Sequence, residues 1–443
     1  MTRADKLVLP IFSALLVGCA STSLRPACLL LLIPRCREVS FVLLRTLTTY
    51  ACILASPASP AKVLDWLYRG TREPRVRLLF RDILCNTEVA RTELRCPAGH
   101  STDPQTHLSR PSFNFLFTLE DKCEWAPRRR AIVVRTPAMV ARARRLPEPF
   151  RPPPGRADLY TRVLDYTFRM AFWVLFGREM TEAEHDSLYP GIADINQNAK
   201  RQRSRADVPA RRACHEAMRA LVARSHGDER FLFHGCAEFH ALSEDAQIDV
   251  CGADILQSIT VQTSDLLCHL LLMWREHGER FSADLEASLQ ETLRLYPLSD
   301  CFYHYQEQGE AWIAPLVLLN RNGWDDPDDF KPERFRAGKD RRKHLSYSGG
   351  PRVCPSFRVT EEIALATLRH LDGCGFWFQP AANFEHERTF SFGLPAQLGY
   401  AQAPGSAPRP PLAPPDFRFP RRRAVLKRHY HCFVRMLAQR EVW

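Results

Sequence analysis

The sequence predicts a mainly α-helical protein, and three observations lead to that fold class. Apolar residues three and four positions apart, the spacing that lines one face of a helix, recur over residues 158–178, 249–274 and 359–371. With 443 residues and 45% hydrophobic content, the chain can bury a large core in one big domain or two smaller ones. The sequence contains no internal repeat and no glycine-rich phosphate loop. Disorder and nucleotide-phosphate binding are therefore not favoured.

The two longer stretches have recognisable ends or interruptions. Residues 158–178 follow a proline-rich linker at 147–155 and end next to Gly177, a residue suited to the turn that closes a helix. Residues 249–274 are mostly apolar, with a polar break, Thr-Val-Gln-Thr-Ser, at 260–264. We expect the first helix to pack its apolar face into the core and the second to be buried over most of its length.

The third helix follows a turn-rich segment that holds one cysteine. Gly349, Gly350 and Pro351 predict a tight, non-helical turn, which places Cys354 just before the helix start. The positive end of the helix dipole and the nearby Arg352 would favour the thiolate, the form of cysteine that ligates iron. A metal or an electrophile would be the partner of this sulfur, and a buried free cysteine in a glycine-rich turn is the alternative.

Charge and cysteine content restrict the partners and the compartment. The formal net charge of +11 suits an anionic lipid surface or an acidic protein partner. The arginines are scattered and no zinc-finger spacing accompanies them, so no nucleic acid is expected as a partner. The 15 cysteines include no Cys-x-x-Cys pair, which favours a reducing, cytosol-facing environment. The segment His429–Cys432 could hold a metal, but a basic tail is the simpler interpretation.

Four residues of the cysteine segment stand at the spacing of the haem-binding loop of the cytochrome P450 family. That family has phenylalanine seven before the cysteine, glycine four before, a basic residue two before and glycine two after. The chain matches with Gly350, Arg352 and Cys354, and departs with Tyr347 and Ser356. The resemblance implies haem b as cofactor, Cys354 as the metal ligand, and Tyr347, Gly350 and Arg352 as cofactor-binding residues.

Two upstream motifs strengthen this resemblance. Glu291 and Arg294 stand three apart on one helical face, and Pro332–Phe335 has the sequence Pro-Glu-Arg-Phe. They resemble the family's Glu-x-x-Arg pair and the segment whose arginine, here Arg334, completes a structural ion network. The resemblance implies a cytochrome P450 fold, mainly α with a small β-sheet region and partly trimmed. Haem would lie between the second long helix and the loop of Cys354.

Two further pairs of residues are assigned through the resemblance. Trp125 and Arg129 stand four apart, like the Trp-x-x-x-Arg of the family's propionate-contacting helix, although Pro127 disfavours a regular helix interior unless the helix starts there. Gln262 and Thr263 lie at the polar break, where oxygen-activating members carry an acid followed by threonine. An amide can hydrogen-bond but cannot deliver a proton as an acid. These two are the candidate catalytic residues, and an ordinary polar kink in a buried helix is the alternative.

The amide at position 262 and the helix at 158–178 resemble one branch of the family. That branch contains prostacyclin synthase and the sterol 7α- and 12α-hydroxylases. Thiolate ligation favours cleavage of an O–O bond. Three functions of such a site stay open for this chain. They are a monooxygenase acting on a lipid or sterol-like substrate with an NADPH-dependent reductase, a peroxide isomerase, and a degenerate haem-binding protein without turnover. We prefer the first, because most members of the family are monooxygenases.

The chain is expected to have three parts. Residues 1–56 form a hydrophobic N-terminal anchor or interfacial segment, 57–420 a haem-thiolate catalytic domain, and 421–443 a basic C-terminal extension. The apolar N-terminal runs fall short of the about 20 residues of a spanning helix, and a secretory signal or a buried hairpin is the alternative. Eukaryotic members of the family usually carry an N-terminal endoplasmic-reticulum anchor. The resemblance thus implies a membrane surface as a partner, a cytosol-facing catalytic domain and a hydrophobic small-molecule substrate.

Overall fold

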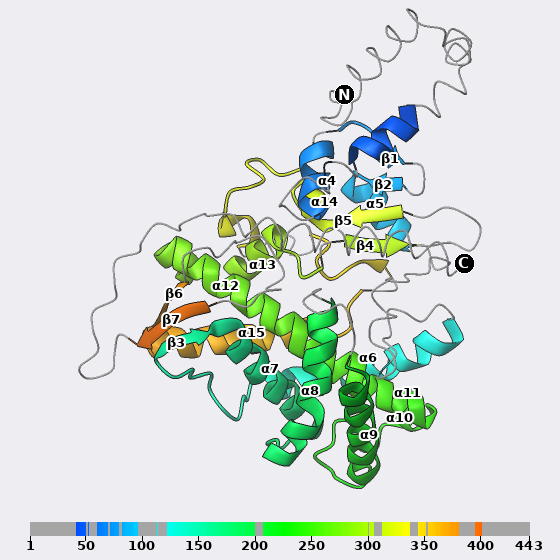
Figure 1. The fold of residues 1–443 in the computed structure, drawn as a ribbon, viewed down its shortest axis with the longest axis vertical. Helices are drawn as coiled ribbons and strands as arrows, with labels where there is room; N and C mark the ends of the chain where they lie inside the picture. The colour runs from blue at the N-terminus through cyan, green and yellow to red at the C-terminus, as the bar shows by residue number, and fades with distance from the viewer. Residues whose placement is uncertain are drawn as a thin grey trace, which may run out of the picture.

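The computed structural model describes most of the chain between residues 41 and 400. Figure 1 shows a larger helical region, in which α12 runs among α7, α13 and α15, and a smaller region that contains a four-stranded sheet. The predicted fold class, mainly α with a small β-sheet region, is confirmed. The described residues are 41–49, 52, 60–69, 71–78, 82–95, 113, 122–199, 207–299, 301–304, 312–336, 344–350, 353–380 and 395–400.

Local sequence explains where α7 (Leu159–Phe176) begins and ends. The side chain of Asp158 accepts hydrogen bonds from the backbone N–H groups of Tyr160 and Thr161, which caps the helix start. Gly177 has a φ of 62°, a left-handed conformation that glycine adopts without steric cost, and it ends the helix. Further helices among the described residues are α4 (Pro60–Tyr68), α5 (Thr87–Arg95), α6 (Lys122–Ala143), α8 (Glu182–Ala199), α9 (Val208–Ser225), α10 (Ala237–His240), α13 (Leu285–Leu295), α14 (Leu316–Leu319), the 3₁₀ helix η4 (Pro332–Phe335) and α15 (Phe357–Gly373).

The long central helix extends beyond the predicted range of 249–274. It runs without a break through α11 (Glu244–Asp249), the π-helix η3 (Val250–Gln257) and α12 (Ser258–Ser282). Gly278, with φ 48° and ψ −118°, kinks its last turns. Within the described residues, this is the one helix long and apolar enough to cross a membrane, and 83% of its apolar window is buried inside the protein. It is therefore a core helix, as the sequence predicts.

Two small sheets flank the helices. In the four-stranded sheet β2 pairs in parallel with β5, and every other strand pair in both sheets is antiparallel. The first sheet has the order β1 (Arg75–Arg77), β2 (Asp82–Leu84), β5 (Trp312–Pro315) and β4 (Cys301–His304), and the second has the order β3 (Gly155–Asp158), β7 (Pro395–Tyr400) and β6 (Phe376–Pro380).

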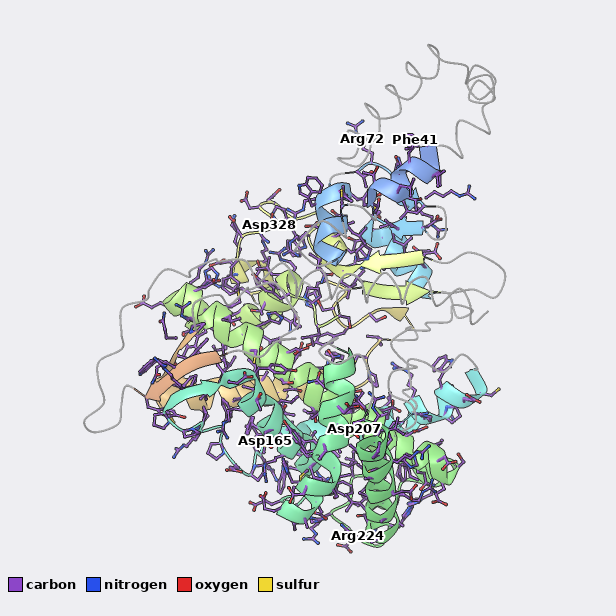
Figure 2. All side chains as sticks on the ribbon, in the orientation of Figure 1. Phe41, Arg72, Asp165, Asp207, Arg224 and Asp328 are labelled. Carbon is purple, nitrogen blue, oxygen red and sulfur yellow. The ribbon has the colours of Figure 1, made fainter. Side chains whose placement is uncertain are left out.

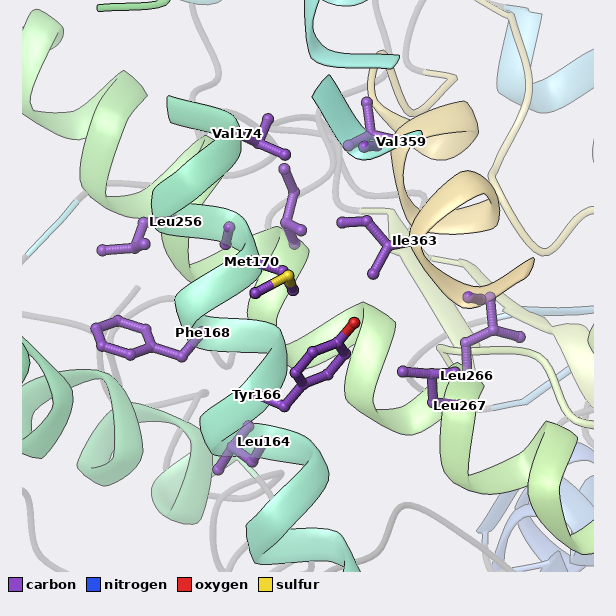
Figure 3. Packing of buried hydrophobic residues seen from close by; sticks show 14 of the residues in the cluster. Leu164, Tyr166, Phe168, Met170, Val174, Leu256, Leu266, Leu267, Val359 and Ile363 are labelled. Carbon is purple, nitrogen blue, oxygen red and sulfur yellow. The ribbon is translucent and has the colours of Figure 1, made fainter. Parts of the chain in front are cut away.

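The main hydrophobic core lies where α7, α12 and α15 meet. Figure 3 shows Phe168 and Met170 of α7, Leu266 of α12 and Ile363 of α15 in this core, and all four side chains are buried. The hydroxyl of Tyr166 projects toward α15, where it lies 3.3 Å from Thr367 Oγ1. Close packing here fixes the position of α15, the helix that follows Cys354.

A helix at residues 41–49 packs on the smaller region. Arg45 donates hydrogen bonds to both carboxylate oxygens of Glu73, each at 3.2 Å, and Thr49 Oγ1 lies 2.6 Å from the hydroxyl of Tyr68. This helix belongs to the segment that we expect to form an N-terminal anchor, so at least its last part contacts the globular protein.

Charged side chains cover the outside of both regions, among them Arg72 in the smaller one and Asp165 and Arg224 in the larger one (Figure 2). Residues 1–40 and 401–443 lie outside the described residues. The division into 1–56, 57–420 and 421–443 and the membrane anchor therefore stay predictions.

Candidate functional site

A loop with two left-handed residues presents Cys354 just before α15. Ser348 and Gly350 have φ values of 68° and 60°, so the turn predicted for this segment is present. The backbone N–H of Cys354 donates to the carbonyl of Tyr347 at 2.9 Å, and that of Val353 donates to Gly350 at 3.3 Å. These bonds close the loop and hold the sulfur in front of the helix.

Burial and the polar groups around Cys354 shift the pKa of its thiol in opposite directions. Burial and, to a smaller extent, the charge of Glu361 leave the pKa of the Cys354 thiol raised, while the backbone N–H groups of Ser356 and Phe357 and the positive charge of Arg129 act to lower it. The two N–H groups belong to the N-cap and the first residue of α15, where backbone donors have no partner within the helix. This half-buried sulfur therefore has donors that would stabilise a thiolate.

Arg129 and Trp125 reach the site from α6. Nη1 of Arg129 donates to the carbonyl of Val353 at 2.6 Å, and burial lowers the pKa of this arginine. Trp125, one turn earlier, is buried. The expectation that Pro127 does not lie inside a regular helix unless it starts one is wrong, because α6 begins at Lys122 and includes the proline in its second turn. The proline removes a single backbone hydrogen bond there, a cost that the tertiary contacts of α6 offset.

A fully buried ion network lies behind the cysteine loop. Glu291 and Arg294 are both 0% exposed and form two hydrogen bonds, Nε to Oε2 at 2.7 Å and Nη2 to Oε1 at 2.8 Å. Nη1 of Arg334 lies 3.4 Å from Glu291 Oε1, and the backbone N–H of Lys331 donates to the same oxygen at 2.8 Å. Arg294 also donates to the carbonyl of Pro327 at 2.7 Å. The network thus attaches the segment before η4 to α13.

A chain of polar side chains connects this network to the loop, and sequence reasoning missed it. Gln290, next to Glu291 on α13, accepts from Nε2 of the buried His344 at 3.0 Å and donates to Glu361 of α15 at 2.8 Å. Ser346 donates from its backbone N–H to Nδ1 of His344 at 3.3 Å. No sequence motif indicates His344, because one partner, Gln290, is 54 residues away and the other, Ser346, belongs to a loop.

The predicted relay residues lie on α12. Thr263 is fully buried, and its Oγ1 donates to Thr360 Oγ1 of α15 at 3.5 Å, while Gln262 is half-buried. The structure therefore brings Thr263 to the helix that follows Cys354. Of the predicted cofactor-binding residues, Tyr347 is half-buried with its ring centroid 5.1 Å from that of Phe357. The prediction for Arg352 lies outside the described residues.

A second group of buried charges lies where α6 meets α11 and the π-helix η3. Arg128 of α6 donates to Asp254 at 2.7 Å and to Asp249 at 3.3 Å, and all three side chains are buried. One turn away, a Cβ on Gly252 would stand 2.3 Å from the ring of Phe113, so only glycine fits there. A π-helix is rare and often marks a functional position, and this signal is visible only in the structure.

Comparisons with known proteins show which sequences are similar to this chain. No family model matches the chain. It is 32% identical over 101 residues to cytochrome P450 81D1 of Arabidopsis thaliana, which is 20% of each protein. It is 30% identical over 138 residues to indolin-2-one monooxygenase of Zea mays, or 25% of each. These matches span about a fifth to a quarter of the length of the curated relatives.

Solved structures match over a larger part of the chain. A zebrafish cytochrome P450 solved with progesterone superposes with a TM-score of 0.59 at 15% identity, over 77% of this chain and 99% of that one. A six-coordinated cytochrome P450 from Thermus thermophilus gives a TM-score of 0.56 at 19% identity, over 76% and 98%. At such identities the structural likeness establishes the fold.

The chain thus has the fold of the cytochromes P450. Its sequence is similar to members of that family over about a fifth to a quarter of their length. The cofactor of that family is haem b, held by a cysteine thiolate. The resemblance to the branch of prostacyclin synthase and the sterol hydroxylases stays a prediction.

The residues around Cys354 fit that cofactor. The sulfur has two backbone donors and a guanidinium nearby, which suit a metal-bound thiolate. Among the described residues, no group of three or more His, Cys, Asp or Glu side chains could hold a metal ion. A porphyrin supplies its own nitrogens to iron, and Cys354 would supply the sulfur ligand.

Proposed function

We propose that the protein is a haem-thiolate monooxygenase that acts on a hydrophobic, lipid- or sterol-like substrate with electrons from an NADPH-dependent reductase. The observation that carries the proposal is the environment of Cys354, where the backbone N–H groups of Ser356 and Phe357 and the charge of Arg129 all face the sulfur just before α15. When bound there, haem supplies an iron whose thiolate ligand favours O–O bond cleavage. The net charge of +11 and the apolar N-terminus support a place at the endoplasmic-reticulum surface, facing the cytosol.

The chain's own residues have distinct tasks in this proposal. Cys354 is the metal ligand, and the carbonyl of Val353 fixes Arg129 beside it, in position for a cofactor carboxylate. Trp125, Tyr347, Gly350 and Arg352 are assigned to the same cofactor from the sequence motifs.

The ion network has a positioning task. Glu291 holds Arg294, Arg334 and the backbone of Lys331 together, and Ser346 Oγ donates to the carbonyl of Leu293 at 2.8 Å on the same helix. Ser346 thereby fixes the cysteine loop to α13, and the ion network fixes the segment before η4 to the same helix. A rigid loop keeps the sulfur in one place before any cofactor binds.

A specific contact also favours a second candidate function. A monooxygenase must deliver protons to dioxygen, and Gln262 and Thr263 are the proposed residues for this step. The hydroxyl of Thr263 is engaged with Thr360 at 3.5 Å, and an amide does not act as an acid. A peroxide isomerase needs no such delivery, because its substrate brings the O–O bond already reduced. We therefore retain isomerisation as the alternative.

The first test concerns the ligand. Purified full-length protein should bind one haem, and its reduced carbon-monoxide complex should show the red-shifted Soret band of thiolate ligation. Cys354→Ser should abolish that band, whereas Cys123→Ser, at an exposed position on α6, should leave it unchanged. A haem-loaded Cys354→Ser protein with the wild-type spectrum would refute the ligand assignment.

The second test separates the chemistries. Product from lipid or sterol substrates that appears only with NADPH, reductase and dioxygen supports the monooxygenase. Anaerobic conversion of a fatty-acid peroxide without reductase supports the isomerase. Haem-loaded protein that carries out neither reaction is the result expected of a degenerate haem-binding protein.

A further inference from the structure

A cysteine, a histidine and an arginine from separate segments meet at the end of α15. His370 lies in the last turn of the helix, Cys374 follows the helix, and Arg151 lies between α6 and β3. The Cys374 sulfur is 3.4 Å from His370 Nε2, and Arg151 Nη2 donates to the sulfur at 4.0 Å. Arg151 Nε also donates to His370 Nε2 at 3.2 Å. All three side chains thus converge on one point.

The geometry equips the imidazole to accept a proton from the thiol. Burial, and then the positive charge of Arg151, lower the pKa of His370, so the ring is neutral at neutral pH. A neutral imidazole beside a thiol can take its proton as the sulfur forms a new bond. The guanidinium beside the sulfur supplies a permanent positive charge where negative charge develops.

Access distinguishes Cys374 from most other described cysteines. Cys85, Cys214 and Cys251 are buried, and burial raises the pKa of each of these thiols, Cys85 and Cys214 to about 12. Cys374 is half-buried, and its arginine neighbour is exposed. A reagent in solution can therefore reach this sulfur. Cys123 is exposed too, which makes it the natural comparison.

We propose that Cys374 is a site of reversible thiolation by small acidic disulfides. The sulfur attacks one sulfur of the disulfide and forms a mixed disulfide, the original S–S bond breaks, and the second half leaves as a thiolate. The thiol proton goes to His370 Nε2, as Arg151 Nε releases its hydrogen bond to that nitrogen, and then to solvent. No further oxidant is needed, because the reagent disulfide is reduced as the protein thiol is oxidised. Arg151 favours a disulfide that carries carboxylates.

This site is separate from the one around Cys354. The 17 residues of α15 lie between the two cysteines, and a helix of that length spans about 25 Å. The proposal therefore does not depend on haem binding or on the proposed monooxygenase, and either can fail without the other.

The test uses the reduced, full-length protein and oxidised glutathione as the probe. Adducts on each cysteine are followed with time by digestion and mass spectrometry. We expect Cys374 to form its adduct at least about tenfold faster than Cys123, because it has a proton acceptor and a guanidinium beside the sulfur. Equal rates at the two positions, or a faster Cys123, would overturn the proposal.

Two variants separate this cluster from mere exposure. His370→Gln should slow the Cys374 adduct at least about tenfold and leave the Cys123 rate unchanged. Labelling of the buried Cys214 reports unfolding in every sample. Arg151→Gln alters an exposed side chain and should lower the preference for oxidised glutathione over the cationic disulfide cystamine about threefold.

The matched control is Arg144→Gln. Arg144 is exposed and pairs at 2.6 Å with Glu362 of α15, the helix that also carries His370. It should leave both the rate and the preference as in the wild type. An unchanged Cys374 rate in His370→Gln, or an unchanged preference in Arg151→Gln, would count against the cluster.

Discussion

Two regions pack against α12 in different ways. On one side, α13 carries the fully buried pair Glu291 and Arg294. On the other, α7 presents an apolar face that includes Phe168 and Phe172. Apolar packing depends on the volume that fills the core and tolerates changes that conserve it. A buried ion pair depends on each partner, since a charge left alone in the interior has lost its water without compensation. The α13 side should therefore respond more strongly to a single substitution.

The largest effect is expected from Glu291→Ala. The variant leaves Arg294 and Arg334 beside an empty space, and the free energy of unfolding should fall by about 3–5 kcal/mol, as for other broken buried pairs. Urea denaturation measures it, and haem incorporation should fall in parallel. The matched control is Glu244→Ala, which breaks an exposed pair with Arg219 and should cost less than about 1 kcal/mol. Equal losses in the two variants would contradict the buried network.

A smaller effect is expected from acidification at His344. Burial, and then the positive charges of Arg294 and Arg91, lower the pKa of this ring to about 4, from an ordinary value of 6.5. The folded state thus binds the proton less readily than the unfolded chain. Stability is full above pH 6.5 and is lost as the pH falls toward 4.

Between about pH 7 and about pH 5, His344 alone should account for a loss of about 2 kcal/mol in the free energy of unfolding. The measurement is the difference between wild type and His344→Gln, which isolates the contribution of this one side chain. The variant should show the shallower pH dependence. Parallel curves for the two proteins would disprove the assignment.

The smallest effect is expected on the apolar side, from Ile363→Val. Ile363 is 0% exposed in the core between α7 and α15, and removing one methylene there should cost about 1 kcal/mol. Val133→Ala, at an exposed position on α6, is the control and should stay within about 0.5 kcal/mol of wild type. A loss for Ile363→Val as large as that for Glu291→Ala would remove the contrast between the two sides.

The sequence predicted much of the candidate site, but it predicted some elements better than others. The turn before Cys354 was predicted from Gly349 and Gly350, and α7 and α15 lie within two residues of their predicted ends. Pro127 was predicted to be disfavoured inside a helix, but it lies inside α6, where tertiary contacts offset the lost hydrogen bond. The roles of Cys354 and the other site residues stay predictions.

By itself, the sequence determined the local features of this protein. Apolar spacing, the cap at Asp158, the left-handed Gly177 and the turn before Cys354 involve residues a few positions apart, and their energetics are settled within that distance. Only the tertiary structure decided that Gln290 bonds His344 and Glu361, that Arg128 meets Asp254, and that Arg151 reaches Cys374. These contacts join residues 54 to 223 positions apart. Such pairs form where the packing of helices brings polar groups from distant segments together away from water. No local sequence pattern specifies these contacts.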